Sequence, residues 1–313
     1  MVRALRAMIG RGAAAIIAPL LILALAGCGD APAERAAGPP PSPLLYEIAS
    51  ADGAVEGWML GTIHALLPGT DWRTPDIGRV IDAADVLVVE VAALGDAEGM
   101  ARTFSALATS PDLPPLAKRV PADLRPQLAA LMARGDLDET AFGTRETWAA
   151  AITLAQVDAP GDPAKGVDRA LIAEAKSAGL AVRELEGARG QLAIFDRLPE
   201  AQQRAMLAAV VRESERVRQD PARLQRAWLA GDAAAIEAST REGLLADPAL
   251  REALLTGRNR RWAAALVPLL AEPPRPLVAV GTAHLVGPDG LVALLEAQGY
   301  RLRRITSAAT PAP

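Results

Sequence analysis

A four-residue pattern that occurs once near each end of the chain constrains the fold more than any other feature. It reads Gly61-Thr62-Ile63-His64 in the first copy and Gly281-Thr282-Ala283-His284 in the second, and it contains the only two histidines. Each copy follows an apolar run of the kind that forms β-strands, residues 57–60 and 276–280. We therefore predict one site assembled from both ends of the chain. The alternative is two unrelated loops, each with a structural histidine.

Strand and helix patterns alternate along the rest of the chain. The run Val86–Val91 is almost entirely apolar, as in strands that are buried on both faces of a parallel sheet. A turn signal at Ala51-Asp52-Gly53 predicts a hairpin between the first two strands. We predict an α/β protein with a central mixed, largely parallel sheet of about six strands and large helical insertions. The expected strands are 44–48, 55–60, 86–91, 180–185, 276–281 and 300–305, and the expected helical blocks cover 96–157 and 191–271.

The first segment has the features of an export signal. Arg3, Arg6 and Arg11 precede an apolar stretch, residues 13–26, that is too short for a stable membrane span. The segment ends in Leu25-Ala26-Gly27-Cys28, which resembles a bacterial lipobox, so cleavage before Cys28 and lipidation of that residue are expected. Because Cys28 is the only cysteine, no intramolecular disulfide can form. An ordinary secretory signal or an uncleaved anchor is the alternative.

Composition divides the remaining chain into a tether, one domain and a tail. Residues 28–43 are rich in Ala, Pro and Gly, which predicts a disordered tether, whereas 44–306 form the domain and 307–313 a disordered tail. Acidic residues outnumber basic ones by 37 to 33, and removing the signal takes away three more arginines. This balance argues against nucleic-acid binding. It fits a lipid-anchored domain that faces the periplasm. Gly29 slightly favours the outer membrane, because many lipoproteins retained at the inner membrane have aspartate there.

Four of the predicted strands end in a side chain that can bind a metal ion or transfer a proton. These side chains are His64, Glu90, Glu186 and His284. In open α/β sheets, sites form beyond the carboxyl ends of the strands. If the four ends lie side by side, two imidazoles and one or two carboxylates converge, as in a divalent-metal site or an acid–base site.

Each candidate residue also has a structural interpretation. Glu90 can pair with an arginine, and Glu186 can cap the following helix. Arg258 and Asn259 can orient a substrate carbonyl, or Arg258 can belong to a solvated helix face. Asp168 is expected to be a helix N-cap. A serine nucleophile is disfavoured because the chain has no GxSxG motif, and the only cysteine is needed for lipidation.

Taken together, these motifs resemble those of the TraB/GumN family, which includes the Tiki proteases and the PrgY pheromone-shutdown proteins. The resemblance covers about residues 44–305, and its most specific part is the closing GxxHLxGxxG stretch. Besides the paired GxxH motifs and Glu90, the residues that carry it are Gly166-Val167-Asp168, Leu185-Glu186-Gly187, Gln191-Leu192, Arg258-Asn259, Trp262 and the segment 280–291.

The resemblance implies a fold, a cofactor and a reaction. The expected fold is similar to that of the haem-binding ChaN and erythromycin-esterase group. The expected cofactor is a divalent ion, manganese, cobalt or zinc, with His64, Glu90 and His284 as its ligands. The expected function is that of a metal-dependent hydrolase, in particular a peptidase that acts on a peptide or protein substrate. The alternative is a regulatory protein that binds haem, a metal or a peptide without turnover.

Residues near this metal would then transfer the proton and stabilise the oxyanion. Glu186 is expected to take and return the proton of the attacking water. Arg258 or Asn259 is expected to stabilise the developing oxyanion. Whether Glu90 binds the ion or acts as the base is left open by the sequence.

Overall fold

The structure, a computed structural model, describes residues 40–306. The predictions for the signal sequence, for Cys28, for most of the tether and for the tail lie outside these described residues. Within 40–306, no helix is long and apolar enough to cross a membrane.

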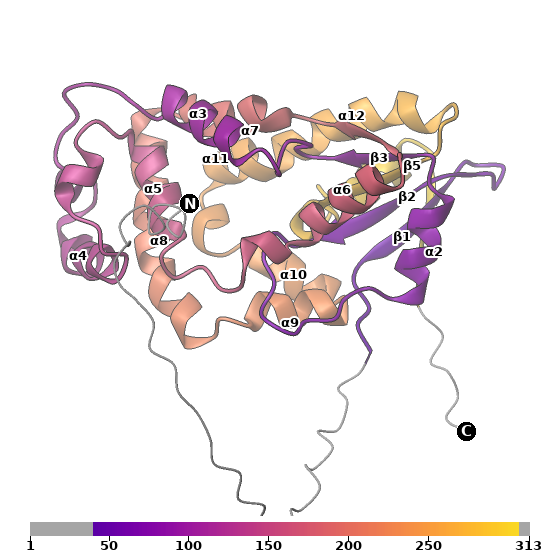
Figure 1. Cartoon of the computed structure of the whole chain (residues 1–313), viewed down its shortest axis with the longest axis horizontal. Coiled ribbons are helices and arrows are strands. Elements are labelled where there is room, and N and C mark those ends of the chain that lie inside the picture. The colour runs from indigo at the N-terminus through magenta and orange to yellow at the C-terminus, as the bar shows by residue number, and fades with distance from the viewer. Residues whose placement is uncertain (1–39, 307–313) are drawn as a thin grey trace, which may run out of the picture. The chain divides into compact units, whose positions relative to one another are not determined.

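A six-stranded sheet forms the centre of the described domain (Figure 1), with the spatial order β4-β3-β5-β2-β1-β6. The strands β4, β3, β5 and β2 run parallel to one another, whereas β1 is antiparallel to both of its neighbours. The predicted mixed, largely parallel sheet is therefore confirmed. The strands are β1 (Leu45–Ala49), β2 (Val55–Thr62), β3 (Val86–Val89), β4 (Ala181–Glu184), β5 (Pro276–Gly281) and β6 (Arg301–Arg304).

The two ends of the chain meet inside this sheet. The strand β2, from the N-terminal hairpin, pairs in parallel with β5 from the C-terminal part, and Thr62 lies opposite Gly281. The last strand, β6, pairs with β1. Parallel neighbours cannot be joined by a tight turn, so long helical connections separate them in sequence. The two GTxH segments therefore leave neighbouring strands of one sheet, which meets the condition set above for a shared site.

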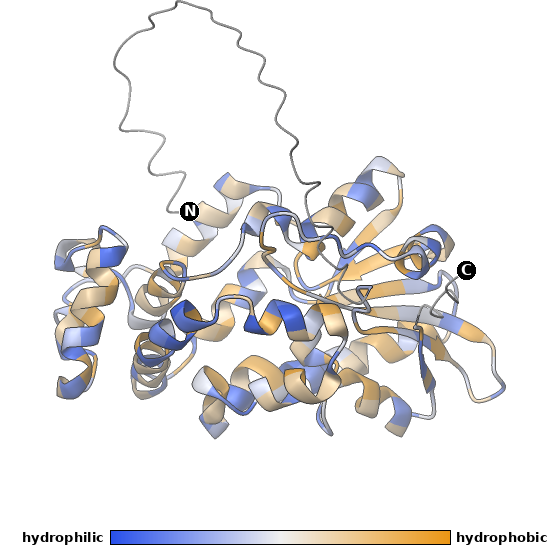
Figure 2. Cartoon of the chain, turned by 90° about the horizontal axis from the view of Figure 1, so that it is seen from below, coloured by the Kyte–Doolittle hydropathy of each residue, from blue (hydrophilic) through white to orange (hydrophobic). Residues whose placement is uncertain are grey.

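Helices cover both faces of the sheet. Successive residues of a strand point to opposite faces, so Leu87 and Val89 pack with α2 and α6, while Val88 packs with α12 and α13. Figure 2 shows the apolar strands between these helices, whose outer surfaces carry more polar residues. The four helices are α2 (Pro75–Ala83), α6 (Val167–Ser177), α12 (Gly257–Leu270) and α13 (Leu291–Ala297).

The inserted helices form a second hydrophobic core. At its centre Trp148 is fully buried, with its ring 5.4 Å from Phe104 and 6.1 Å from Phe195, measured between ring centroids. Gln156, from the segment after α5, and Leu224 of α9 line the cavity described below. The insertion therefore supplies one wall of the site. The remaining helices are α3 (Ala97–Leu107), α4 (Arg125–Arg134), α5 (Thr147–Ala155), α7 (Gly187–Asp196), α8 (Glu200–Gln219), α9 (Arg223–Ala230), α10 (Ala233–Ser239) and α11 (Pro248–Arg251).

Candidate functional site

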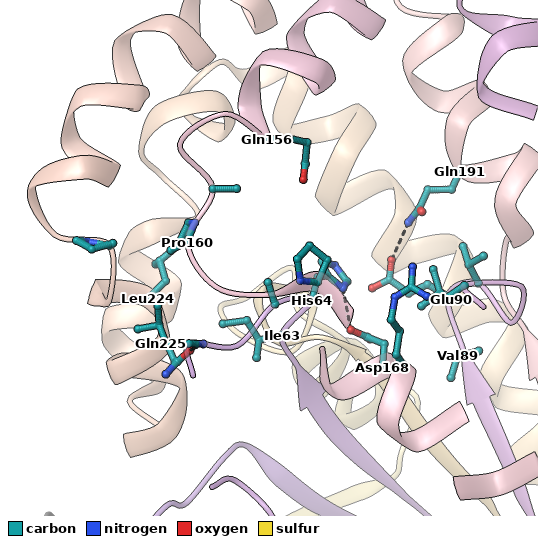
Figure 3. A pocket seen from close by; sticks show the side chains of 18 residues that line it. Ile63, His64, Val89, Glu90, Gln156, Pro160, Asp168, Gln191, Leu224 and Gln225 are labelled. Atoms are coloured by element: carbon teal, nitrogen blue, oxygen red, sulfur yellow. Dashed lines mark hydrogen bonds and ion pairs between the residues drawn. The ribbon is translucent and has the colours of Figure 1, made fainter. Parts of the chain in front are cut away.

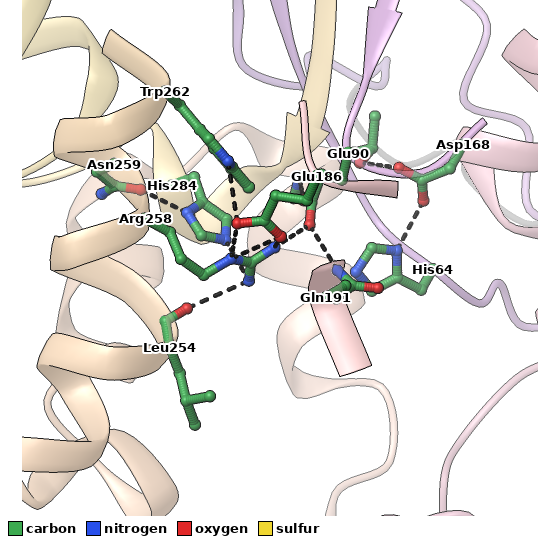
Figure 4. Close-up of polar contacts among 12 residues, drawn as sticks. His64, Glu90, Asp168, Glu186, Gln191, Leu254, Arg258, Asn259, Trp262 and His284 are labelled. Atoms are coloured by element: carbon green, nitrogen blue, oxygen red, sulfur yellow. Dashed lines mark hydrogen bonds and ion pairs between the residues drawn. The ribbon is translucent and has the colours of Figure 1, made fainter. Parts of the chain in front are cut away.

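The four predicted strand-end side chains follow four adjacent parallel strands. His64 comes just after β2, Glu90 directly after β3, Glu186 just after β4 and His284 at the end of the short turn after β5. Because the carboxyl ends of parallel strands lie at one edge of a sheet, these side chains gather there. Figure 4 shows them close together in two sets of polar contacts, one around His64 and Asp168 and the other around Arg258.

A carboxylate from α6 holds His64. The imidazole Nδ1 lies 2.8 Å from Asp168 Oδ2, and Thr62 donates a hydrogen bond to Asp168 Oδ1 at 2.5 Å. An ionised carboxylate only accepts hydrogen bonds, so Nδ1 of His64 carries a proton. Its Nε2 has no partner among residues 40–306. The side chain of Asp168 is only 7% exposed, whereas that of His64 is 70% exposed.

Asp168 also controls the charge of His64. Partial removal of water by neighbouring protein atoms disfavours the charged form of the ring, but the hydrogen bond and negative charge of Asp168 outweigh this effect. Together they raise the pKa of His64 to about 9. The same contacts hold the pKa of Asp168 below its ordinary value, although burial acts in the opposite direction. At neutral pH the two side chains therefore form an imidazolium–carboxylate pair.

The prediction that Asp168 is a helix N-cap was wrong. The N-cap of α6 is Gly166, and Asp168 lies in the first turn with its carboxylate directed to His64. A Cβ atom on residue 166 would lie 2.3 Å from the carbonyl oxygen of His64, so only glycine permits this close approach. The amide of Val167 donates to the carbonyl of Ile63 at 2.9 Å. The start of α6 is thus fixed against the end of β2.

The second histidine is buried, and Asn259 fixes its tautomer. Asn259 Nδ2 donates to the carbonyl oxygen of Asp289 at 2.7 Å, so Oδ1 is the amide atom that faces His284 Nδ1, at 2.5 Å. Because an amide oxygen only accepts, Nδ1 carries the proton and Nε2 keeps its lone pair. Burial is the main cause that lowers the pKa of His284, to about 3, so this ring is neutral.

Arg258 joins the two predicted carboxylates in a buried ion cluster. Its Nη2 lies 2.7 Å from Glu90 Oε2 and 2.8 Å from Glu186 Oε2. The guanidinium carbon lies 4.5 Å from the ring centroid of Trp262, whose Nε1 donates to Glu186 at 3.1 Å. None of the three charged side chains is more than 9% exposed. The alternative that Glu90 pairs with an arginine is therefore confirmed, and Arg258 does not belong to a solvated face.

Both carboxylate oxygens of Glu90 accept hydrogen bonds. Oε1 accepts a hydrogen bond from the amide of Gly281 at 2.8 Å, and Oε2 accepts one from Gln191 at 3.1 Å in addition to Arg258. Burial alone would raise the pKa of Glu90, but its interactions with the neighbouring imidazoles, with Arg258 and with the amide of Gly281 outweigh burial and lower the pKa. Glu90 is therefore an ionised carboxylate at neutral pH.

The helix that carries Arg258 is irregular just before this residue. The helix that starts at α11 widens to a π-turn over Glu252–Thr256 before it continues as α12. A π-turn leaves carbonyl groups without their usual helical partner, and such turns occur often at functional sites. Here Arg258 Nη1 donates to the carbonyl oxygen of Leu254 at 3.2 Å, which helps to fix the guanidinium.

Gly281 keeps a small space open where the three predicted ligands meet. A Cβ atom on this residue would lie 3.3 Å from Glu90 Oε1, 3.6 Å from His284 Cδ2 and 3.8 Å from His64 Nε2. Any larger residue would fill the volume between the two imidazoles and the carboxylate. The glycine of the second GTxH pattern therefore has a spatial role at the centre of the site.

A cavity of about 490 Å³ opens onto one half of the network (Figure 3). His64, Glu90 and Asp168 form its polar wall. Arg258 and His284 lie behind this wall and are not among the lining residues. A molecule in the cavity would therefore first meet His64 Nε2 and the edge of Glu90.

The donor types fit a divalent cation, whereas their present spacing does not. Both imidazoles have Nδ1 held by an acceptor, which is the usual arrangement behind metal-bound histidines, so Nε2 is the nitrogen that would bind an ion, in the case of His64 after loss of its Nε2 proton. However, Arg258 contacts Glu90 Oε2 and lies 3.4 Å from His284 Nε2, so a bound cation would compete with it. Within residues 40–306, no three His, Cys, Asp or Glu side chains are grouped so that they could hold a metal ion as they stand.

The structure brings the described site candidates together at one edge of the sheet, while their roles stay predictions. Sequence reasoning missed the contact of Asp168 with His64, because no local pattern links residues 104 positions apart. It also gave no role to Gln191 or Trp262, although both belong to the motifs quoted above. Cys28 lies outside the described part of the chain. The candidates at this edge are His64, Glu90, Glu186, Arg258, Asn259 and His284.

The fold and the site define an α/β protein with a histidine–carboxylate centre at the carboxyl edge of a mixed sheet. The chain belongs to the TraB/PrgY/gumN family, whose model matches residues 44–304. Comparisons with curated proteins and with solved structures give no match. The expected likeness to the ChaN and erythromycin-esterase group is consistent with the mixed sheet and stays a prediction.

Proposed function

We propose that this protein is a hydrolase that cleaves peptide bonds in a peptide or protein substrate. The observation that carries the proposal is the His64–Asp168 pair: His64 lies on the cavity wall, and its Nε2 has no partner in the described part of the chain. A histidine oriented by a carboxylate is the arrangement that general acid–base catalysts use. The cavity is large enough for several residues of an extended substrate.

His64 would move a proton in two steps. Its neutral form takes a proton on Nε2 from a water molecule as the water oxygen attacks the substrate carbonyl carbon, and Asp168 stabilises the imidazolium. The Nε2–H group then donates this proton to the leaving nitrogen as the C–N bond breaks. Arg258 and Asn259, which were expected to stabilise the oxyanion, lie behind the cavity wall, so we propose that they act by positioning Glu90 and His284. Glu186 remains an alternative proton acceptor, but its ion pair with Arg258 favours a positioning role.

We also propose that a divalent ion, manganese, cobalt or zinc, binds between the two histidines. The ligands would be Nε2 of His64, Nε2 of His284 and the carboxylate of Glu90, around the space that Gly281 leaves open. When bound, such an ion lowers the pKa of a water molecule and polarises a carbonyl group. Two observations support this: the tautomers of both imidazoles and the absence of a Cβ atom at position 281.

One set of variants tests both parts of the proposal. The full chain, His64→Ala and His284→Ala are incubated with each metal, and bound metal is measured by elemental analysis beside hydrolysis of a peptide library. One ion per chain that both substitutions remove supports the shared metal site. Hydrolysis that is lost in His64→Ala supports the acid–base role. A folded wild-type protein that binds no metal overturns the metal site, and one that hydrolyses no peptide with any of the metals overturns the hydrolase.

We further propose that the protein is anchored in the cell envelope through a lipid on Cys28, with its domain in the periplasm. The Leu25-Ala26-Gly27-Cys28 sequence supports this proposal. Cys28→Ser should prevent incorporation of labelled fatty acid and release the protein from membranes. Unchanged membrane association of this variant, with no label in the wild type, would contradict the anchor.

Binding without turnover is the second candidate function. The observation in its favour is that both carboxylates near the histidines are already engaged by Arg258. The ligand would then be a haem, a metal or a peptide held in the same cavity. A Soret shift on haem addition that is lost in His64→Ala would favour this function. Hydrolysis by the wild type would exclude it.

A further inference from the structure

We infer that Arg169 binds a carboxylate group of the substrate, and that an apolar part of the same substrate lies against the cavity wall that includes Leu224. The inference deepens the proposed function, because it names the chemistry of the molecule that enters the proposed catalytic cavity. It does not depend on a bound metal.

Arg169 is a charged residue of the cavity wall that has no ion-pair partner among residues 40–306. It is the only arginine or lysine among the lining residues, and it is half-buried. The two carboxylates on the wall already have cationic partners, since Asp168 pairs with His64 and Glu90 pairs with Arg258. Among residues 40–306, no side chain forms a hydrogen bond or ion pair with the Arg169 guanidinium.

The position of Arg169 in its helix strengthens the attraction for an anion. It lies in the first turn of α6, where the positive end of the helix dipole disfavours a cation. The acidic residue of the same turn, Asp168, is occupied by His64 and Thr62. A substrate carboxylate would therefore meet an uncompensated guanidinium, which binds carboxylates through two parallel hydrogen bonds.

The other side of the cavity is apolar. Leu224 is 51% exposed, and among residues 40–306 no other large hydrophobic side chain is classed as exposed. Figure 3 shows Leu224 and Pro160 across the cavity from Glu90, and Leu67 and Leu94 also line it. A half-exposed leucine on a cavity wall buries apolar surface only when a ligand covers it, which is favourable at about 25 cal/mol per Å².

This apolar side is held in place. Gln225, next to Leu224, accepts a hydrogen bond from the amide of Leu67 at 2.8 Å and donates one to Thr70 at 2.8 Å. The loop after β2 and the helix α9 are thereby tied together before any ligand binds. The cavity therefore offers a fixed apolar wall, the guanidinium of Arg169, which has no ion-pair partner among residues 40–306, and His64. This combination fits a peptide with a leucine-like side chain and a nearby carboxylate. That carboxylate is either the C-terminus or an acidic side chain.

Three acetylated peptides distinguish these sources with the full chain. The first is a leucine-containing tetrapeptide with a free C-terminal carboxylate, the second is its C-terminal amide, and the third is the amide with a glutamate in place of one residue. Binding is measured by calorimetry and cleavage by chromatography. We expect at least one acid form to bind about tenfold more tightly than the neutral amide. A preference for the first identifies the C-terminus, and a preference for the third identifies an acidic side chain.

Variants separate the inference from the proposed hydrolase. Arg169→Gln should reduce binding of the acid form to the level of the amide, and Leu224→Ser should weaken the binding of all three peptides by a similar factor. Arg183→Gln is the matched control, because Arg183 is an exposed arginine of β4 that does not line the cavity. A preference for the acid form without any cleavage supports the inference and counts against the hydrolase. Equal binding of acid and amide, or a preference unchanged in Arg169→Gln, overturns the inference.

Discussion

At the residue scale, both histidines carry a proton on Nδ1 but differ in charge. Each has Nδ1 bound to an oxygen acceptor, an ionised carboxylate for His64 and a neutral amide for His284. Burial opposes the charged form of both rings, and only the carboxylate of Asp168 overcomes it. One imidazole is thus an acid at neutral pH, while the other is a neutral nitrogen base.

Asp168→Asn should lower the pKa of His64 from about 9 toward the ordinary value of 6.5. The substitution removes the negative charge and keeps a side chain of the same size. Because the chain has only two histidines, an NMR titration of the imidazole protons resolves both without ambiguity. If His64 is the general base, the pH at which the rate rises should fall together with this pKa. Asn259→Ala is the control, since it contacts His284 and not His64. An unchanged His64 titration in Asp168→Asn would contradict the assignment.

The neutral His284 should make the fold sensitive to mild acid. Its folded-state pKa of about 3 lies below the ordinary 6.5, so the unfolded chain takes up a proton first as the pH falls. Stability is therefore retained above pH 6.5 and decreases below it, by about 2–3 kcal/mol at pH 4.5. Carboxylates with lowered pKa values add to this only below about pH 4.5. Denaturant unfolding at several pH values, with a chelator present, measures the effect.

A variant identifies the residue responsible for that acid sensitivity. His284→Gln should flatten the stability curve between pH 6.5 and 4.5, although the protein is less stable overall. His64→Gln should leave this decrease in place. Its own ion pair stabilises the fold below pH 6.5 and ceases to do so only as the pH rises through 9. The same acid decrease in His284→Gln as in the wild type would show that another group is the cause.

At the element scale, the site depends on the contact between the start of α6 and the end of β2. Gly166→Ala introduces a Cβ atom 2.3 Å from the carbonyl oxygen of His64, and backbone atoms cannot move aside easily. We expect a loss of about 2 kcal/mol in unfolding free energy, together with a lower pKa of His64 as Asp168 is displaced.

A second glycine provides the control for this contact. Gly78 lies within α2, and a Cβ atom there would come no closer than 3.9 Å to a neighbouring side chain. Gly78→Ala should therefore stabilise the protein by up to about 1 kcal/mol, because alanine favours the helix. Chemical unfolding and the NMR titration measure both variants. Equal stability of the two alanine variants would contradict the proposed close contact.

At the scale of the whole molecule, sequence patterns predicted the sheet better than they predicted the site's contacts. Strands such as Val86–Val89 are almost entirely apolar, so their burial and parallel pairing follow from the sequence, and the strand ends locate His64 and His284. Asp168 could not be assigned, because a carboxylate at the start of a helix normally caps it. Arg258 could not be assigned either, since its neighbours in sequence are exposed arginines and only the tertiary fold buries it.

The Glu90–Arg258–Glu186 cluster connects the ends of the strands β3 and β4 to the distant helix α12. We therefore expect it to contribute to the free energy of unfolding of the whole domain. Arg258→Met leaves two ionised carboxylates buried without a cation and should reduce the unfolding free energy by about 3–5 kcal/mol. The triple variant Glu90→Gln, Glu186→Gln, Arg258→Met removes all three charges and should recover a large part of this loss. A triple variant that is as unstable as the sum of its parts would show that the three side chains act independently. Recovery of stability without recovery of hydrolysis would instead show that the charges are kept for the chemistry of the site.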